Sequence, residues 1–214
     1  MKNLLLITGM LFSLNFVSAQ QGEPMGMREK IEQLEQRPSF EELQNLAGEF
    51  SAFANEDESN WLLNYYAALA QIRMGRSLMM EGKVDELDAY ADKAEGYVTK
   101  AFKSQPENSE LYILQKMIHG LRLMVNPMKR YFSESMLGAQ ALEKAEKIDP
   151  ANPRITILRA EDLYYTPEEY GGSKAKGLEL FQKSIEQYDS YQVKGENAPN
   201  WGRLEAQYYL DSKP

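Results

Sequence analysis

One spacing of small and bulky residues recurs along the chain and restricts its possible folds more than any other feature. A small residue is followed after four positions by a bulky one, after three more by a small one, and after five more by proline or, once, aspartate. The three copies are Ala94, Val98, Ala101, Pro106; Gly138, Leu142, Ala145, Pro150; and Gly177, Phe181, Ser184, Asp189. Intervals of three and four lie on one helix face, where small side chains let a neighbouring helix approach closely. Because proline cannot continue a helix, the pattern predicts long helices separated by turns.

Apolar residues at helical spacing dominate the rest of the chain, and no convincing alternating strand occurs. Ser39 and Glu42 form a capping-box pattern, Pro153 suits a first helical position, and Asn126-Pro127 is expected to break a helix. The helices are expected over 27–36, 40–54, 61–80, 84–104, 109–125, 134–148, 153–165, 173–188 and 199–210, and a loop over 189–200. The sequence therefore predicts one all-α domain of eight or nine helices.

The N-terminal residues have the composition of a secretory signal peptide. Lys2 precedes an apolar run from Leu4 to Val17, and small residues then lead to an expected cleavage after Ala19. The run is too short for a bilayer-spanning anchor, and no membrane insertion is expected after cleavage. The location predicted for the mature chain, which begins at Gln20, is periplasmic or secreted.

Composition narrows the function further. The 214 residues include no cysteine, so stability must come from packing without disulfides. The formal net charge is −8, and removal of Lys2 makes it −9. Nucleic acids and anionic membrane surfaces need clustered lysine and arginine, so no nucleic-acid partner is expected.

The repeated spacing resembles the second helix of the tetratricopeptide repeat, and KAEKIDPANPR (144–154) resembles the junction between its units. The chain departs from the pattern in the second unit, where Lys116 and His119 occupy the small and bulky positions of the first helix. This unit, from Pro106 to Pro150, is also longer than a usual tetratricopeptide repeat. The resemblance implies an all-α solenoid of helix hairpins, a family used mainly for binding. Its expected parts are a signal peptide (1–19), an N-terminal helix pair (20–58), three degenerate units (59–188) and a loop with a C-terminal capping helix (189–214).

The same resemblance implies a concave groove made by the first helix of each unit. The residues that it places in this groove are Asn64, Gln71, Met117, Glu161, Tyr164 and Tyr165. The phrase YYTPEEYGG (164–172) is also similar to small exported tetratricopeptide-like proteins of bacteria, which include accessory components of periplasmic substrate transport.

The stretch GGSK (171–174) has two interpretations. Glycines followed by lysine suggest a phosphate-binding loop, but that motif has the form G-x-x-x-x-G-K-[ST] and stands between a strand and a helix. Here the preceding segment is helical, the order of Ser173 and Lys174 is reversed, and Glu168 and Glu169 would repel a phosphate. We therefore interpret the stretch as a turn: Thr166 and Pro167 begin a short helical turn, the glycines end it, and Ser173 caps the next helix.

No constellation indicates catalysis. His119 is the only histidine, without an identifiable nucleophile and orienting acid, and is interpreted as a packing residue. Neither NEDESN (55–60) nor DELDAYAD (85–92) matches a calcium loop, and methionines at helical spacing usually fill gaps between helices. No catalytic, cofactor-binding or metal-binding residues are therefore predicted.

Two kinds of binding role fit these observations. The leading hypothesis is a non-catalytic periplasmic scaffold whose groove binds a protein or peptide partner. The alternative is a small-molecule-binding accessory to an uptake system, with a closed pocket under the final helices. A groove open along its length would favour a peptide, whereas an enclosed cavity would favour a metabolite.

Overall fold

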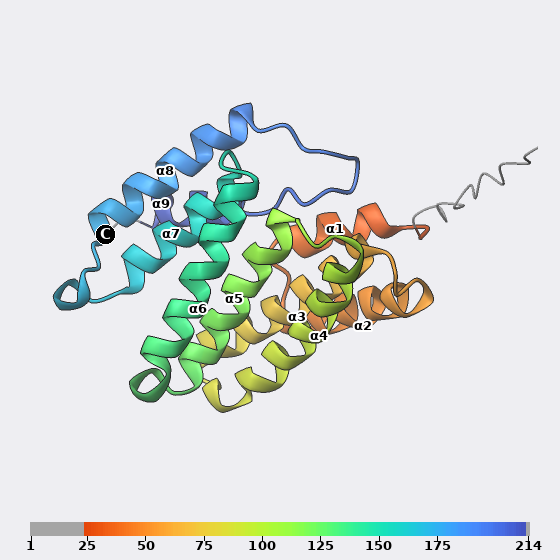
Figure 1. Cartoon of the computed structure of the whole chain (residues 1–214), viewed down its shortest axis with the longest axis horizontal. Coiled ribbons are helices and arrows are strands. Elements are labelled where there is room, and N and C mark those ends of the chain that lie inside the picture. Colours follow the sequence, from red (N-terminus) through yellow and green to blue (C-terminus); the bar gives the residue numbers. More distant parts are fainter. Residues whose placement is uncertain (1–23, 213–214) are drawn as a thin grey trace, which may run out of the picture.

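The computed structural model describes residues 24–212, and this part of the chain is helical without any strand (Figure 1). The expected signal peptide lies outside these residues. The α-helices are α1 (Met27–Glu35), α2 (Phe40–Glu56), α3 (Trp61–Met80), α4 (Leu87–Ser104), α5 (Ser109–Val125), α6 (Pro127–Ile148), α7 (Pro153–Tyr165), α8 (Lys174–Ser190) and α9 (Arg203–Asp211), with 3-10 turns η1 (Val84–Glu86) and η2 (Glu168–Tyr170). The all-α prediction is confirmed, and none of the described helices is both long and apolar enough to cross a membrane.

Capping residues set the ends of most helices where the sequence indicated. Ser39 and Glu42 form the predicted capping box, which pairs two backbone amides that α2 itself cannot pair. The side chains of Asn60, Asn108 and Asn152 accept hydrogen bonds from the first turns of α3, α5 and α7. Short polar turns therefore connect the long helices.

The start of α6 differs from the prediction. The helix begins at Pro127, whereas the sequence placed its start after Ser133. Proline ends a preceding helix but is also favourable at a first helical position, where its missing N–H has no partner to lose. The side chain of Asn126 caps this new helix by accepting a hydrogen bond from the Lys129 amide, so the break at Pro127 is immediately followed by a new start.

The repeated small residues lie where the two helices of a hairpin touch. A Cβ atom added to Gly138 of α6 would lie 3.0 Å from the Lys116 side chain of α5, and one added to Gly177 of α8 would lie 2.9 Å from Cβ of Tyr164 in α7. The bulky repeat positions Val98, Leu142 and Phe181 are buried. Small residues thus allow close approach while one large side chain fills the contact, which gives the hairpins α3–α4, α5–α6 and α7–α8.

Two separate apolar cores hold these hairpins together. The larger one extends from α1 to α7 and includes Trp201, which comes from the segment before α9. The smaller one joins the last three helices through Ile157, Ala160, Phe181 and Ala206. The α7–α8 hairpin and α9 therefore form a C-terminal group with a core of its own.

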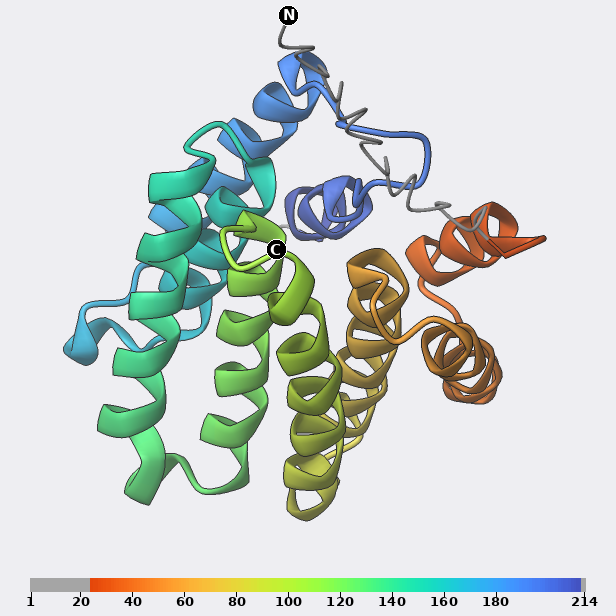
Figure 2. The same cartoon turned by 45° about the vertical axis from the view of Figure 1, so that its right-hand side comes forward.

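The end of the chain folds back into the curved layer of hairpins. Figure 2 shows α9 nearly end-on, within the hollow between the α7–α8 hairpin and the helices α3 and α5. The Trp201 indole donates a hydrogen bond to the Tyr65 hydroxyl over 2.7 Å, and Tyr66 donates to the carbonyl of Asn197 over 2.9 Å. Gly202, with φ 114°, then turns the chain into α9.

The GGSK stretch is a turn between α7 and α8. Gly171 has φ 90° and ends η2, and a Cβ atom on Gly172 would lie only 1.7 Å from the Thr166 carbonyl oxygen. The Ser173 hydroxyl accepts a hydrogen bond from the Lys176 amide and caps α8, as predicted. Thr166 does not cap η2; that turn begins after Pro167 without a side-chain cap.

Candidate ligand-binding site

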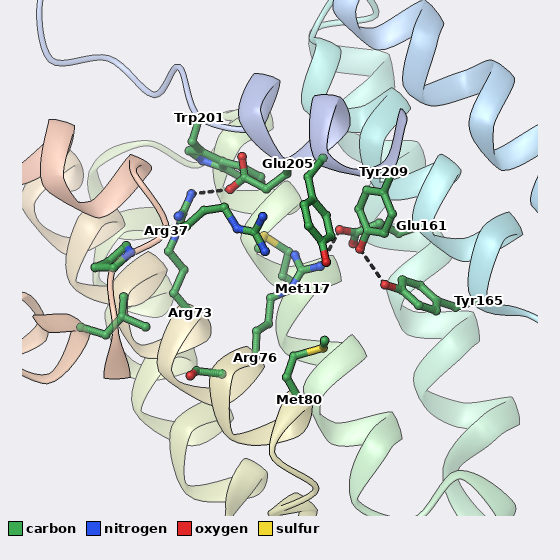
Figure 3. Close-up of a pocket in the computed structure, with 14 residues that line it drawn as sticks. Arg37, Arg73, Arg76, Met80, Met117, Glu161, Tyr165, Trp201, Glu205 and Tyr209 are labelled. Atoms are coloured by element: carbon green, nitrogen blue, oxygen red, sulfur yellow. Dashed lines mark hydrogen bonds and ion pairs between the residues drawn. The ribbon is translucent and has the colours of Figure 1, made fainter. Parts of the chain in front are cut away.

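A cavity of about 300 Å³ lies beneath α9, on the concave side of the hairpins (Figure 3). Its floor comes from α3, α5 and α7, its roof from Trp201 and α9, and one side from the linker between α1 and α2. This volume is within the range of small-molecule sites. Because α9 lies in the concave face, the open groove expected for a peptide is replaced by a partly covered cavity.

Arginine is the characteristic charged residue of the cavity. Arg73 donates to Glu205 of α9 over 2.8 Å and to the Leu34 carbonyl over 2.7 Å. Arg76 donates to Glu161 of α7 over 2.5 Å. Both ion pairs join α3 to the C-terminal group, so they stabilise the position of the cavity walls and also place charges in the lining.

A third guanidinium differs from these two. Arg37, in the linker before α2, places its guanidinium 4.0 Å from the centre of the Tyr208 ring, and none of the ion pairs found among residues 24–212 includes it. Its φ of 56° is the one positive value at a non-glycine position of the described chain. Left-handed backbone at a residue with a side chain is uncommon and costs energy, so the fold holds Arg37 in place. With three arginines and two glutamates in its lining, the cavity has a surplus positive charge.

The remaining lining is aromatic and sulfur-containing. Tyr165, Tyr208, Tyr209 and Trp201 present rings to the cavity region, and Met80 and Met117 add thioethers. Tyr209 also stacks on Phe181 with ring centroids 4.3 Å apart, which fixes its position through the smaller core. Rigid rings beside flexible thioethers suit a flat apolar ligand.

Two side chains of the cavity, Tyr209 and Arg76, are kept in defined protonation states by their surroundings. Burial, the Glu161 charge and the hydrogen bond with Tyr165 raise the pKa of Tyr209, so its phenol stays protonated at neutral pH. The Glu161 carboxylate raises the pKa of the Arg76 guanidinium, so that guanidinium stays charged. The cavity therefore offers a fixed cation at Arg76 and a neutral phenol at Tyr209.

A buried hydrogen-bond network anchors the roof of the cavity to its floor. Arg154 of α7 donates to both carboxylate oxygens of Glu110 in α5, and Tyr65 of α3 donates to the same carboxylate over 3.2 Å. Tyr65 in turn accepts from Trp201, and Tyr188 of α8 donates to the Trp201 carbonyl. Loss of any member would loosen the segment that carries α9.

The structure brings together three of the six residues expected in a groove. Met117, Glu161 and Tyr165 line the cavity. Asn64 and Gln71 do not: both are buried, and Asn64 donates to the carbonyls of Glu58 and Asn60 within its own helix start. The repeat register places both residues in the groove, but it contains no information on which positions of α3 become buried.

Tyr164 is also displaced from its expected place. It packs in the smaller core, with its ring centroid 5.3 Å from Tyr209 and 6.2 Å from Phe181. His119 lies outside the cavity lining, half-buried, with Nδ1 2.8 Å from Glu134 of α6. That pairing between α5 and α6 agrees with its interpretation as a packing residue.

Most of the cavity could not be predicted from the sequence because its lining comes from distant segments. Arg37, Trp201, Glu205, Tyr208 and Tyr209 belong to a linker and to a final helix taken for an outer cap. One signal was available in the sequence. Arg73 and Arg76 are the only charged residues of α3, three positions apart in an otherwise apolar and neutral helix.

Together, the helix hairpins and the covered cationic, aromatic cavity define an all-α ligand-binding protein. The solved structure of the HusA haemophore from Porphyromonas gingivalis is similar to this chain, with a TM-score of 0.73 and 31% sequence identity over 88% of this chain and 93% of that one. The chain therefore belongs to the family of the HusA haemophore. No family model and no curated protein matches the chain. The family is one of binding proteins, in agreement with a non-catalytic binding role.

Proposed function

We propose that this protein binds haem or a related tetrapyrrole in the cavity beneath α9 and carries it after export, without catalysing a reaction. The relationship to a haemophore supports the class of ligand. The periplasmic or secreted location and the tetratricopeptide relationship of the hairpins belong to the same proposal. Within the two hypotheses drawn from the sequence, this is the small-molecule one.

The side chains that line the cavity suit both parts of a tetrapyrrole, the ring system and the carboxylate edge. Such a ligand is a flat apolar ring system with carboxylate side chains on one edge. The rings of Trp201 and Tyr208 and the thioether of Met117 suit the apolar plane, while the arginines suit the carboxylates. Met80 and Tyr165 are exposed at the cavity edge, so a ligand larger than the enclosed volume extends past them toward solvent.

The observation that carries the proposal is the unpaired guanidinium of Arg37. Glutamates already pair with Arg73 and Arg76, whereas Arg37 stacks on Tyr208 and has no ion-pair partner among residues 24–212. A guanidinium can bind a carboxylate through two parallel hydrogen bonds and still stack on an aromatic ring. Arg37 therefore provides the free anion-binding group of the cavity.

Iron coordination would use different side chains. Histidine, cysteine, methionine and tyrosine are the usual axial ligands of haem iron. His119 pairs with Glu134 outside the cavity lining, whereas Met80 and Met117 present thioethers to it. Burial raises the pKa of Tyr209, which disfavours a tyrosinate ligand there.

Titration with haem, followed by its absorption band, tests the proposal. We expect Arg37→Ala to weaken binding about tenfold, which corresponds to the loss of one charge-assisted contact of about 1.4 kcal/mol. Arg28→Ala is the matched control, because Arg28 makes only exposed ion pairs with Glu32 and Glu196. Thermal melting of both variants separates loss of contact from loss of fold.

Two outcomes would count against this function. Unchanged haem affinity in a folded Arg37→Ala variant would remove the assigned role of Arg37. Absence of haem binding by the wild-type chain, together with specific capture of one protein from an envelope extract, would favour the protein-partner hypothesis. In that case the partner would have to displace α9 or use another surface.

A further inference from the structure

The first half of α6 exposes a continuous apolar surface that no described part of the chain covers. Met128 is 95% exposed, Phe132 86% and Met136 56%, and their spacing of four residues places them in one stripe. Tyr131, 41% exposed, touches Phe132 and faces Tyr170 of η2, which is 70% exposed, with ring centroids 5.6 and 6.5 Å away. We call these five residues the α6 patch.

The α6 patch is large for a monomer. At about 200 Å² for a large side chain, its exposed fractions amount to roughly 700 Å² of exposed surface, most of which belongs to apolar side chains and rings. The largest apolar patch on a typical monomeric protein is about 300–600 Å², and a stable interface covers about 800 Å² of each partner. The patch with its immediate rim therefore has the size of one side of a protein interface.

The charges around the patch are arranged on two opposite edges. Lys129 is exposed on the outer edge of the stripe, and Glu168 and Glu169 are exposed beside Tyr170 on the other. The other charged residues of this stretch are paired within the chain, Arg130 with Asp88 and Glu134 with His119. In Figure 1 this half of α6 and the turn that contains η2 lie on the side of the molecule away from α1.

We propose that the α6 patch is the interface of a two-fold homodimer of this chain. A two-fold axis in the plane of the patch and parallel to the stripe lays each basic edge over the acidic edge of the other copy, because an isologous interface brings residue i onto j and j onto i. The straight stripe of Met128, Phe132 and Met136 packs against its own copy at the helix crossing. The size of the patch and its self-complementary edges favour a second copy over a membrane or a partner of one charge sign.

Sedimentation of the purified mature chain over a concentration series tests this. We expect the wild type to shift from monomer to dimer as concentration rises, and Phe132→Glu to weaken the dimer at least about tenfold by placing a charge in the apolar contact. Met25→Glu is the matched control, since Met25 is 98% exposed but lies next to α1. Phe132 is exposed, so both variants are expected to melt like the wild type.

Charge reversal tests the two-fold geometry itself. Lys129→Glu alone is expected to weaken the dimer, and its combination with Glu168→Lys and Glu169→Lys to restore it. Wild-type chain that stays monomeric, or a dimer that Phe132→Glu leaves intact, would overturn the interface. Restoration that fails in the triple variant would overturn the two-fold pairing, and binding of a monomeric chain to lipid vesicles through Phe132 would assign the patch to a membrane instead.

Discussion

At the scale of single residues, backbone geometry decides the meaning of the GGSK stretch. Gly172 lies so close to the Thr166 carbonyl that no side chain fits, and Gly171 has a left-handed backbone. Lys174 lies 5.7 Å from the centre of the Tyr164 ring, in contact with the smaller core rather than with the cavity. Gly171 and Gly172 are therefore required by the geometry of the turn, and Lys174 has a minor packing role.

Gly172→Val tests this at one atom. The added side chain forces the turn before α8 to rebuild, and we expect the free energy of unfolding to fall by about 2 kcal/mol or more. Gly48→Ala is the control, because a Cβ atom there meets nothing within 4 Å and helix propensity favours alanine.

Lys174→Ala is expected to leave haem affinity unchanged, because Lys174 lies outside the cavity lining. A lower affinity with intact stability would revive the phosphate-loop interpretation.

At the scale of elements, the first turns of α6 show where sequence patterns stop being informative. The sequence predicts the ends of helices with regular apolar faces to within a few residues, because apolar spacing and caps are local properties. The turns from Pro127 onward have most of their apolar side chains exposed, and a distant ion pair helps to hold them to the fold: Arg130 donates to both carboxylate oxygens of Asp88 near the start of α4. No local pattern encodes that contact.

Acid should weaken this attachment. The hydrogen bonds from Arg130 lower the pKa of Asp88, so the pair stabilises the fold above the unfolded-state pKa of about 3.9 and loses its effect as pH falls through the lower folded-state value. Both side chains are partly exposed, so the contribution is below about 1 kcal/mol. We expect urea unfolding to show a smaller loss of stability between neutral and strongly acidic pH for Asp88→Asn than for wild type. Equal losses would mean that the pair contributes nothing.

At the scale of the whole molecule, the position of α9 determines the kind of site. Hairpins alone would leave an open concave face, and the repeat spacing led to the prediction of an open groove there. Its closure depends on Trp201, whose contacts with Tyr65 and the larger core join residues more than a hundred positions apart. Repeat spacing describes neighbours within a hairpin, so it contains no information on a final helix that returns to the middle.

Trp201→Ala should therefore affect both stability and binding. Removal of a buried indole costs about 3–5 kcal/mol, and we expect the amides of α9 to exchange with solvent faster than those of α5. Leu204→Ala, at an exposed position of α9, serves as control. If the α9 amides of the Trp201→Ala variant exchange as slowly as in the wild type and its haem affinity is unchanged, the smaller core alone keeps α9 in place over the cavity.

The link between Trp201 and Tyr65 also orders events during synthesis. A chain that emerges N-terminus first can form its early hairpins as they appear, but the space around Tyr65 is filled only when Trp201, 136 positions later, arrives. Until then the larger core stays incomplete, because the place of the Trp201 indole is empty. The same dependence means that a shortened chain without Trp201 keeps this gap in its larger core and is expected to be cut more readily by proteases.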